Sequence, residues 1–276
     1  MNTNPKICLT VAGLDPSGGA GIIADIKTFT ALDCFATAAV TSLTFQNTCG
    51  VFGSVSQTAE TVRGQILPVV EDYEIAAVKT GMLPTREIIE EIARIVEENN
   101  LKNLVVDPVI RSTSGFDLIG ESALRALIEK LFPLAAIITP NLPEAGRISK
   151  TEIENEADIG RAARIMQSFG AKNVLIKGGH KLSENSKFAR DYLFAENDLH
   201  VFESEYIETT STHGTGCTLA AAIAANLALG KSLVEAVGLS KKFVTEAIRS
   251  APKIGKGNSP VNHSVKIPNF RFQIPD

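Results

Sequence analysis

The sequence predicts a single α/β domain built on a mostly parallel β-sheet. Strand-like and helix-like segments alternate along all 276 residues, as in a series of βαβ units with right-handed crossovers. Several of the strand-like segments are short and almost continuously apolar, which is typical of strands buried on both faces. No linker, internal repeat or low-complexity stretch interrupts this order. One domain spanning residues 1–276 is therefore expected.

Each element is expected from its own residue pattern. The chain opens with an apolar run at residues 7–12, and residues 21–32 then carry Ile22, Ile26 and Phe29 at helical spacing. Residues 87–98 likewise repeat isoleucine and valine on one helix face. Further strands are expected at residues 36–45, 75–78, 104–106, 135–138 and 174–176, and further helices at residues 121–131, 157–169, 216–229 and 233–249.

Composition restricts the class of protein. A hydrophobic fraction of 44% with 21% charged residues is ordinary for a soluble globular protein. The net charge of −4 argues against nucleic acid as a partner, because no basic block offsets it. No apolar run reaches membrane-spanning length, and the first residues do not form a signal peptide. The four cysteines and four histidines lack metal-ligand or disulfide spacing, so a reducing cytoplasm is the expected location. Three of the cysteines, Cys8, Cys34 and Cys49, are expected to be buried small hydrophobes.

Polar or glycine-rich segments follow six of the predicted strands. Because the carboxyl ends of parallel strands meet at one edge of a sheet, these segments are expected to form one ligand site. They are residues 13–19, 46–47, 79–82, 107–108, 139–141 and 177–179.

The most informative segment is His213-Gly214-Thr215-Gly216-Cys217, followed by an alanine-rich helix former. Glycines before a helix let main-chain N–H groups converge at the positive end of the helix dipole, which attracts phosphate or a developing oxyanion. A thiol in this setting is expected to have a lowered pKa and to favour the thiolate form. A histidine–cysteine dyad of His213 and Cys217 is disfavoured, since the glycine loop between them fixes no geometry.

Two glycine-containing segments leave alternatives open. Residues 17–21 match a loose dinucleotide fingerprint, but the next strand ends in Gln46 rather than in the acidic residue that grips a ribose. Close approach of the backbone to a small substrate is the favoured explanation of these glycines, ahead of a tight turn alone and of a dinucleotide site. Gly230-Lys231-Ser232 resembles the tail of a P-loop but follows a helix, so a helix C-cap is expected there.

Charged residues at the strand ends are candidate phosphate and metal ligands. Asn141 and Glu144 can face one point and hold hydrated Mg²⁺ on a nucleotide, or they can simply cap a helix. Beside an anion hole and without a P-loop, the magnesium interpretation is favoured. Asp107 is expected to point to the rim, and Lys177 either meets phosphates or is a snorkelling lysine. Asp25 lies away from the apolar stripe of its helix and can be a solvated surface acid.

These segments together resemble the hydroxymethylpyrimidine/phosphomethylpyrimidine kinases of thiamine biosynthesis, within the ribokinase superfamily. The resemblance runs nearly end to end and is carried by residues 12–21, 46–48, 79–83, 107–109, 139–145, 177–180 and 213–218. It implies a ribokinase-like three-layer α/β/α sandwich with a central, mostly parallel sheet. It also implies a homodimer that uses ATP and Mg²⁺ to phosphorylate 4-amino-5-hydroxymethyl-2-methylpyrimidine, first to the monophosphate and then to the diphosphate.

The resemblance further implies a role for each site residue. Cys217 stands where most of the superfamily has an aspartate as general base, with Gly214, Thr215 and Gly216 forming the anion hole. Substrate binding is implied for Gln46, Asp25, Gly13, Ala20, Met82 and Val109. Nucleotide and phosphate binding is implied for Asp107, Lys177, Thr212 and Lys241, and Mg²⁺ binding, through water, for Asn141 and Glu144.

The sequence departs from the family pattern at four positions. Leu14 stands where serine or threonine is usual, and Arg111 where a small apolar residue is commoner. Asp33 replaces a frequent glycine at a helix end, which is tolerable because aspartate can enter the left-handed region. Ser259 replaces a preferred glycine and puts the conformation of the C-terminal loop in question.

Three other functions compete with the pyrimidine kinase. A pyridoxal or pyridoxine kinase of the same branch also acts on a hydroxymethyl heteroaromatic, but the Gln46 amide offers both a donor and an acceptor to an aminopyrimidine edge. A ligand sensor that has lost phosphoryl transfer is disfavoured because Cys217, Asn141, Glu144 and Lys177 are all present. A dehydrogenase would bind a dinucleotide tightly.

Overall fold

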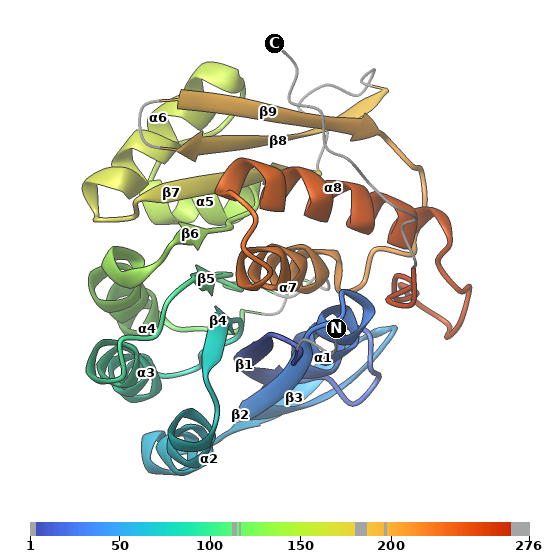
Figure 1. Ribbon diagram of the computed structural model, residues 1–276. Helices are drawn as coiled ribbons and strands as arrows, with labels where there is room; N and C mark the ends of the chain where they lie inside the picture. Colours follow the sequence, from blue (N-terminus) through green and yellow to red (C-terminus); the bar gives the residue numbers. More distant parts are fainter. Residues whose placement is uncertain (1–3, 112–114, 116, 180–186, 196–197, 266–276) are drawn as a thin grey trace.

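A single mixed sheet organises the computed structural model, which describes residues 4–111, 115, 117–179, 187–195 and 198–265. Its strand order is β3-β2-β1-β4-β5-β6-β7-β8-β9 (Figure 1). The pairs from β2 through β1, β4, β5 and β6 to β7 are parallel, whereas β3, β8 and β9 add antiparallel edges. The strands are β1 Ile7–Leu14, β2 Phe35–Asn47, β3 Gly50–Ser56, β4 Ile75–Thr80, β5 Leu104–Val106, β6 Ile137–Ile138, β7 Asn173–Gly178, β8 Phe188–Ala195 and β9 Asp198–Glu205.

Helices cover both faces of the sheet and complete the expected α/β/α sandwich. On one face lie α2 Ala59–Asp72, α3 Arg86–Glu98, α4 Glu121–Ala126, α5 Leu142–Ser149 and α6 Glu156–Ser168. On the other lie α1 Gly21–Ala31, α7 Thr215–Ala228 and α8 Leu233–Arg249 (Figure 1). Each face buries its own apolar cluster against the sheet, so the strands are apolar on both sides as their sequences predict.

Helix α7 packs closely onto the centre of the sheet because most of its side chains are small. Six alanines between Ala220 and Ala228 are buried, which lets the helix approach β4 and β5 closely. The amphipathic helix α3 instead presents one isoleucine-rich face to the sheet, and Thr85 caps its first turn by accepting the Ile88 N–H. The N-terminus of α7 lies at the carboxyl ends of the central strands, since Gly216 and Cys217 line one cavity with Asp107 and Lys177.

Several elements differ from the expectation. Helix α2 was not expected, because it contains the helix breakers Gly64 and Pro68 without ending at either. Strands β3, β8 and β9 were not expected, since charged residues and glycines break their apolar pattern. The helix expected at residues 121–131 is α-helical only to Ala126 and continues as a π-helical turn. Asp33 adopts the left-handed conformation foreseen for it, with φ of 59°.

No helix in the described part of the chain is long and apolar enough to span a membrane.

Cys8 and Cys34 are buried as expected, but Cys49 is exposed in the turn between β2 and β3, so the expectation of burial was wrong for Cys49. Gly230, with φ of 79°, follows the end of α7, in agreement with a helix cap rather than a P-loop.

Candidate active site

A cavity of about 1150 Å³ opens at the carboxyl ends of the parallel strands, where the sequence places its polar segments. All the predicted site residues except Asp25 line it. They are Gly13, Ala20, Gln46, Met82, Asp107, Val109, Asn141, Glu144, Lys177, Thr212, Gly214, Thr215, Gly216, Cys217 and Lys241. His180, at the end of one quoted segment, lies outside the described residues.

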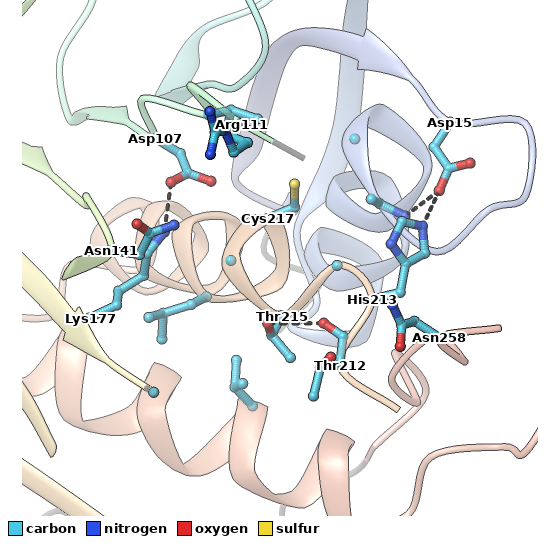
Figure 2. A pocket seen from close by; sticks show the side chains of 18 of the residues that line it. Asp15, Asp107, Arg111, Asn141, Lys177, Thr212, His213, Thr215, Cys217 and Asn258 are labelled. Atoms are coloured by element: carbon cyan, nitrogen blue, oxygen red, sulfur yellow. Dashed lines mark hydrogen bonds and ion pairs between the residues drawn. The ribbon is translucent and has the colours of Figure 1, made fainter. Parts of the chain in front are cut away.

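Residues 213–217, here called the anion loop, lead into the N-terminus of α7. Gly214 is the N-cap and has φ of 82°, and a β-carbon there would lie 1.8 Å from the carbonyl oxygen of Gly19. Only glycine therefore lets this loop pack onto the loop after β1. The Thr215 N–H is occupied, because it donates to the carbonyl oxygen of Thr212 at 3.3 Å. The Thr215 hydroxyl donates to the same oxygen at 3.1 Å (Figure 2). Among the hydrogen bonds of the described residues, the N–H groups of Gly216 and Cys217 have no acceptor, so these two can serve an anion.

The Cys217 thiol stands in the first turn of α7, half-buried against the cavity. Burial raises its pKa to about 11, and the carboxylates of Asp25 and Asp107 act in the same direction. The ammonium group of Lys79 and the main-chain N–H of Gly21 oppose this rise without cancelling it. The expectation that the setting favours a thiolate was therefore wrong for the protein without bound ligand, since desolvation outweighs the helix terminus.

Asp107 and Lys177 form an ion pair beside the anion loop, with 2.8 Å between Lys177 Nζ and Asp107 Oδ1. Thr139 donates to the same carboxylate oxygen at 3.1 Å. Burial works to lower the Lys177 pKa, but the carboxylates of Asp107 and Glu144 outweigh it and raise that pKa, so the lysine is charged. A β-carbon at Gly216 would lie 3.2 Å from Lys177 Nζ, which places this cation next to the free amides. The arrangement can neutralise phosphate oxygens.

Asn141 and Glu144 form a capping box at the start of α5. The Asn141 side chain accepts the Glu144 N–H at 2.9 Å, and Glu144 Oε2 accepts the Asn141 N–H at 2.9 Å. The other Glu144 oxygen accepts the N–H of Ile110 at 3.1 Å. The capping alternative is thus confirmed, while both residues still line the cavity. Glu144 also anchors the backbone beside Val109, whose φ of 43° is a strained conformation for a β-branched residue.

The donor set fits a hydrated Mg²⁺ but not a metal held by protein alone. Among the described residues, no group of three or more His, Cys, Asp or Glu side chains could hold a metal ion. Mg²⁺ usually keeps several waters and takes one or two carboxylates together with substrate phosphates. Asp107 and Glu144 supply two carboxylates at the cavity wall, and Asp107 Oδ2 carries no hydrogen bond among those of the described residues.

One end of the cavity is organised by Asp15, a residue to which sequence reasoning gave no role. Asp15 Oδ2 lies 2.7 Å from His213 Nε2 and accepts the Ala20 N–H at 2.8 Å, while Oδ1 binds Ser17 (Figure 2). Burial would raise the Asp15 pKa, but hydrogen bonds from His213, Ser17 and Gln46 lower it well below its usual range. His213 therefore pairs with Asp15 and not with Cys217, as expected from the rejection of the dyad.

Asp25 does not line the cavity, so its assignment to the substrate pocket is corrected, as is the alternative of a solvated surface acid. The side chain is fully buried beneath the cavity floor. Its Oδ2 atom lies 2.8 Å from Nζ of Lys79 and accepts the Thr10 hydroxyl at 2.6 Å. Lys79 follows Val78 in an apolar strand, and only this unusual position could have indicated the pair.

The opposite end of the cavity is lined by β8, β9 and α8. Lys241 forms a buried ion pair there, with its Nζ 2.8 Å from Asp191 Oδ2. Asp191 Oδ1 accepts the N–H of Gly178 at the end of β7. Apolar residues Val244 and Ile248 of α8 line the same region. This end can take a flat apolar group next to a fixed cation.

Residues 252–259, here called the C-terminal loop, connect two walls of the cavity. The Asn258 N–H donates to the carbonyl oxygen of Thr48 at 2.8 Å, next to Gln46 in the turn after β2. The His213 N–H donates to the carbonyl oxygen of Ser259 at 3.2 Å. The Ser259 hydroxyl accepts the Ile254 N–H at 2.9 Å and donates to Pro252 O, so the serine that replaces the usual glycine joins the two ends of the loop.

Arg111, another departure from the family pattern, lines the cavity and pairs with Asp117 at 3.1 Å.

Comparisons with known proteins agree with this geometry. A family model described as phosphomethylpyrimidine kinase matches residues 15–262. The chain is 43% identical over 262 residues to a hydroxymethylpyrimidine/phosphomethylpyrimidine kinase of Haemophilus influenzae, covering 95% of this chain and 97% of that protein. The solved structure of a phosphomethylpyrimidine kinase from Clostridium difficile 630 is 44% identical with a TM-score of 0.77, covering 88% of this chain and 99% of that one. A pyridoxal kinase from Staphylococcus aureus in complex with AMP-PCP is 34% identical with a TM-score of 0.87, covering 95% and 94%.

Proposed function

The chain belongs to the phosphomethylpyrimidine kinase family and is a phosphotransferase, and from this premise we propose the reaction that its site performs. It transfers the γ-phosphoryl group of ATP to the hydroxymethyl oxygen of 4-amino-5-hydroxymethyl-2-methylpyrimidine, here called the first transfer. It then phosphorylates the resulting monophosphate to the diphosphate, the second transfer. Both steps belong to thiamine biosynthesis.

The observation that carries this proposal is the position of the Cys217 thiol among groups that bind negative charge. The thiol lies in the same turn of α7 as the open amides of Gly216 and Cys217. The charged amine of Lys177 stands beside Gly216. Phosphoryl transfer needs chiefly positioning and neutralisation of the moving charge, which such amides and cations supply.

We assign the chemical steps as follows. In the first transfer the substrate hydroxyl gives its proton to the Cys217 sulfur, and its oxygen bonds to the γ-phosphorus while ADP leaves. The amides of the anion loop and Lys177 hold the equatorial oxygens during this displacement. In the second transfer the attacking group is already an anionic phosphate, so no strong base is needed.

The two ends of the cavity support different ligands. We propose that the ring binds between Gly13, Ala20, Met82 and Val109, with its amino edge on Gln46. The adenine and its phosphates then extend past Thr212 toward Lys241, where Val244 and Ile248 offer an apolar surface. ATP as the phosphoryl donor is supported by the AMP-PCP complex of the related pyridoxal kinase.

A bound Mg²⁺ would neutralise the nucleotide phosphates during transfer. We propose that Asp107 and Glu144 hold it through water, with Asn141 alongside. In this arrangement Lys177 pairs with one oxygen of Asp107 at 2.8 Å, which leaves the other carboxylate oxygen for the hydrated ion.

The direct test is product analysis with purified protein, ATP, Mg²⁺ and the free pyrimidine alcohol. The expected result is a monophosphate that appears first and a diphosphate that follows, with one ADP released at each step. Absence of either product while ATP is consumed would contradict the bifunctional assignment. ATP consumption that does not depend on the pyrimidine would contradict the kinase assignment altogether.

A pyridoxal kinase is the second candidate, because solved pyridoxal kinases match the fold with TM-scores of 0.86 and 0.87. Their sequence identity of 37% and 34% is lower than the 43% and 44% of the pyrimidine kinases. We therefore expect a higher kcat/KM for the pyrimidine alcohol than for pyridoxal. A higher kcat/KM for pyridoxal in parallel assays would instead favour the pyridoxal kinase assignment.

We further propose that the protein acts as a cytoplasmic homodimer. Leu43, Phe45 and Val55 form an exposed apolar face on the β2–β3 hairpin, with exposed fractions of 42%, 54% and 51%. Contiguous exposed apolar surface of this kind marks protein interfaces. Light scattering coupled to size exclusion is expected to give twice the chain mass, and F45K is expected to shift it to the monomer. Monomeric wild-type protein would refute the proposal.

A further inference from the structure

We propose that His213 is a positioning residue whose bond to Asp15 docks the anion loop onto the loop after β1, so that the attacking oxygen is aligned with the γ-phosphorus. Residues 15–20 are here called the ring loop, because Ala20 is proposed to contact the substrate ring. The inference rests on the proposed function for its effect on turnover. The docking of the two loops can be measured without any phosphoryl transfer.

The ring loop and the anion loop meet through closely packed backbone. A β-carbon at Gly214 would lie 1.8 Å from the carbonyl oxygen of Gly19, and a β-carbon at Gly19 would lie 2.4 Å from Cδ2 of His213. These two glycines therefore let the loops touch directly. Glycine backbones have no side chains that interlock, so polar bonds between the loops decide how the loops align.

The Asp15 carboxylate supplies such a bond. Its Oδ2 atom lies 2.7 Å from Nε2 of His213 in the anion loop (Figure 2). The same oxygen accepts the N–H groups of Gly19 and Ala20 in the ring loop, at 3.2 and 2.8 Å. The other oxygen, Oδ1, accepts the N–H and the hydroxyl of Ser17 at 2.8 and 2.7 Å. One carboxylate thus holds the ring loop in shape and the anion loop against it.

Both partners of this bond are fixed in place. The Asp15 side chain is 2% exposed. Burial would raise its pKa, but hydrogen bonds hold that pKa well below the usual range, so the group is ionised and only accepts. His213 Nε2 therefore carries the proton of a charge-assisted bond, which is about twice as strong as a neutral one. The His213 N–H donates to Ser259 O at 3.2 Å, and its carbonyl oxygen accepts the Val261 N–H at 3.4 Å.

The bond bears on transfer because each loop is proposed to hold one reactant. The ring loop contacts the pyrimidine, whereas the anion loop binds phosphate. In each transfer a substrate oxygen bonds to the γ-phosphorus while the bond to the bridging oxygen breaks, and that electron pair leaves with ADP. Misplacing the reacting atoms by about 1 Å can slow such a step about 100-fold. His213 neither gains nor loses a proton, so loss of its bond is expected to slow both transfers alike.

The test replaces His213 by leucine, which cannot donate, and by glutamine, whose amide nitrogen takes the place of Nε2. Asp15 keeps its bonds within the ring loop in both variants. His213→Leu is expected to lower kcat about 10- to 100-fold in both transfers, with KM for each substrate within about threefold. His213→Gln is expected to stay within about threefold of the wild type in kcat. Calorimetric titration with ADP counts the folded sites and is expected to give one site per chain in every variant.

Four results would overturn the proposal. An unchanged kcat in His213→Leu would show that the bond does not align the reactants. A loss confined to the first transfer would show that His213 acts on the proton of the alcohol. A number of ADP sites that falls in proportion to kcat would show that His213 only supports folding. A glutamine variant as slow as the leucine variant would show that the donated bond is not what matters.

His213→Asn keeps the test decisive if the leucine variant does not fold, because its amide is polar but too short to reach Asp15. It is expected to match the losses given for His213→Leu, and wild-type kcat would count against the proposal. Tyr192→Phe is the matched control. It removes a side-chain hydrogen bond of 2.8 Å to Glu156, and neither residue is among the described residues that line the cavity. Both transfers are expected to stay within about threefold.

Amide hydrogen exchange of the ligand-free protein measures the docking itself. Peptides covering the ring loop and the anion loop are expected to exchange at least about tenfold faster in His213→Leu, while a peptide of α3 keeps its rate. Unchanged exchange in both loops, or equally faster exchange in α3, would refute the docking role. If exchange changes as expected but the wild-type protein makes neither phosphorylated product, the proposed function fails while the docking of the two loops by His213 stands.

Discussion

Replacing Cys217 by alanine is expected to slow the first transfer about 100-fold and to leave the second within about threefold of the wild-type rate. The two steps share the same cavity, the same phosphoryl donor and the same anion loop. They differ in the attacking group, which is a neutral alcohol in the first step and a phosphate anion in the second. Only the alcohol has to lose a proton.

The magnitude follows from the surroundings of the sulfur. General base catalysis is worth about 10²- to 10⁴-fold. With a thiol pKa of about 11, thiolate is scarce at neutral pH, which puts the expected loss at the lower end of that range. About 100-fold corresponds to about 2.7 kcal/mol in the activation free energy. Alanine keeps the main-chain amides of Gly216 and Cys217, so charge stabilisation in the second transfer is retained.

The assay follows ADP release with each substrate presented separately, at saturating ATP and Mg²⁺. Cys217→Ser is the matched control for shape, since it keeps a small polar atom but provides a much weaker base. It is expected to resemble the alanine variant in the first transfer. Equal losses in both transfers for Cys217→Ala would refute the reasoning and show that the sulfur acts through geometry.

Three other predictions concern pH and the C-terminal segment. Because the thiol pKa is about 11, the rate of the first transfer is expected to rise with pH from neutral to alkaline, while the second stays flat; parallel pH profiles would contradict this. Burial lowers the His263 pKa from 6.5 to about 4, so the unfolded chain binds the proton first as pH falls. Stability is then lost below pH 6.5, by about 2 kcal/mol at pH 5, and urea unfolding of His263→Gln is expected to show a weaker pH dependence. Ser259→Gly removes two hydrogen bonds of the C-terminal loop and is expected to cost about 1–2 kcal/mol, a fall in Tm of a few degrees; an unchanged melting curve would show that the loop closes without them.

The fold could be predicted from the sequence because most buried strands and amphipathic helices have a recognisable local residue pattern. Helix α8 begins and ends where its pattern predicts, and Ser232 caps it. Strand β9 and helix α2 were missed, since the first is a charged edge strand and the second contains Pro68. Such elements are stabilised by neighbours that are distant in sequence, so their own residue patterns do not predict them.

The candidate site was predictable in its residues but not in their pairing. The hydrogen bond between Asp15 and His213 joins positions 198 residues apart, and the ion pair of Lys79 and Asp25 spans 54 residues. Strand ends place side chains at a common edge, yet they do not specify which partners meet. The Cys217 pKa was misjudged for a related reason. A helix terminus is visible in sequence, whereas the desolvation that opposes it depends on everything packed around it.

The C-terminal loop has a consequence for attempts to redesign this enzyme. It is hydrogen-bonded both to the backbone beside Gln46 and to the backbone of His213, so the proposed ring-binding end and the anion loop are held by the same segment. We expect chimaeras that receive only the β2–β3 segment of a pyridoxal kinase to lose turnover on every alcohol. Transplanting that segment together with residues 252–259 should restore turnover, and equal activity of both chimaeras would show that the two halves evolve independently.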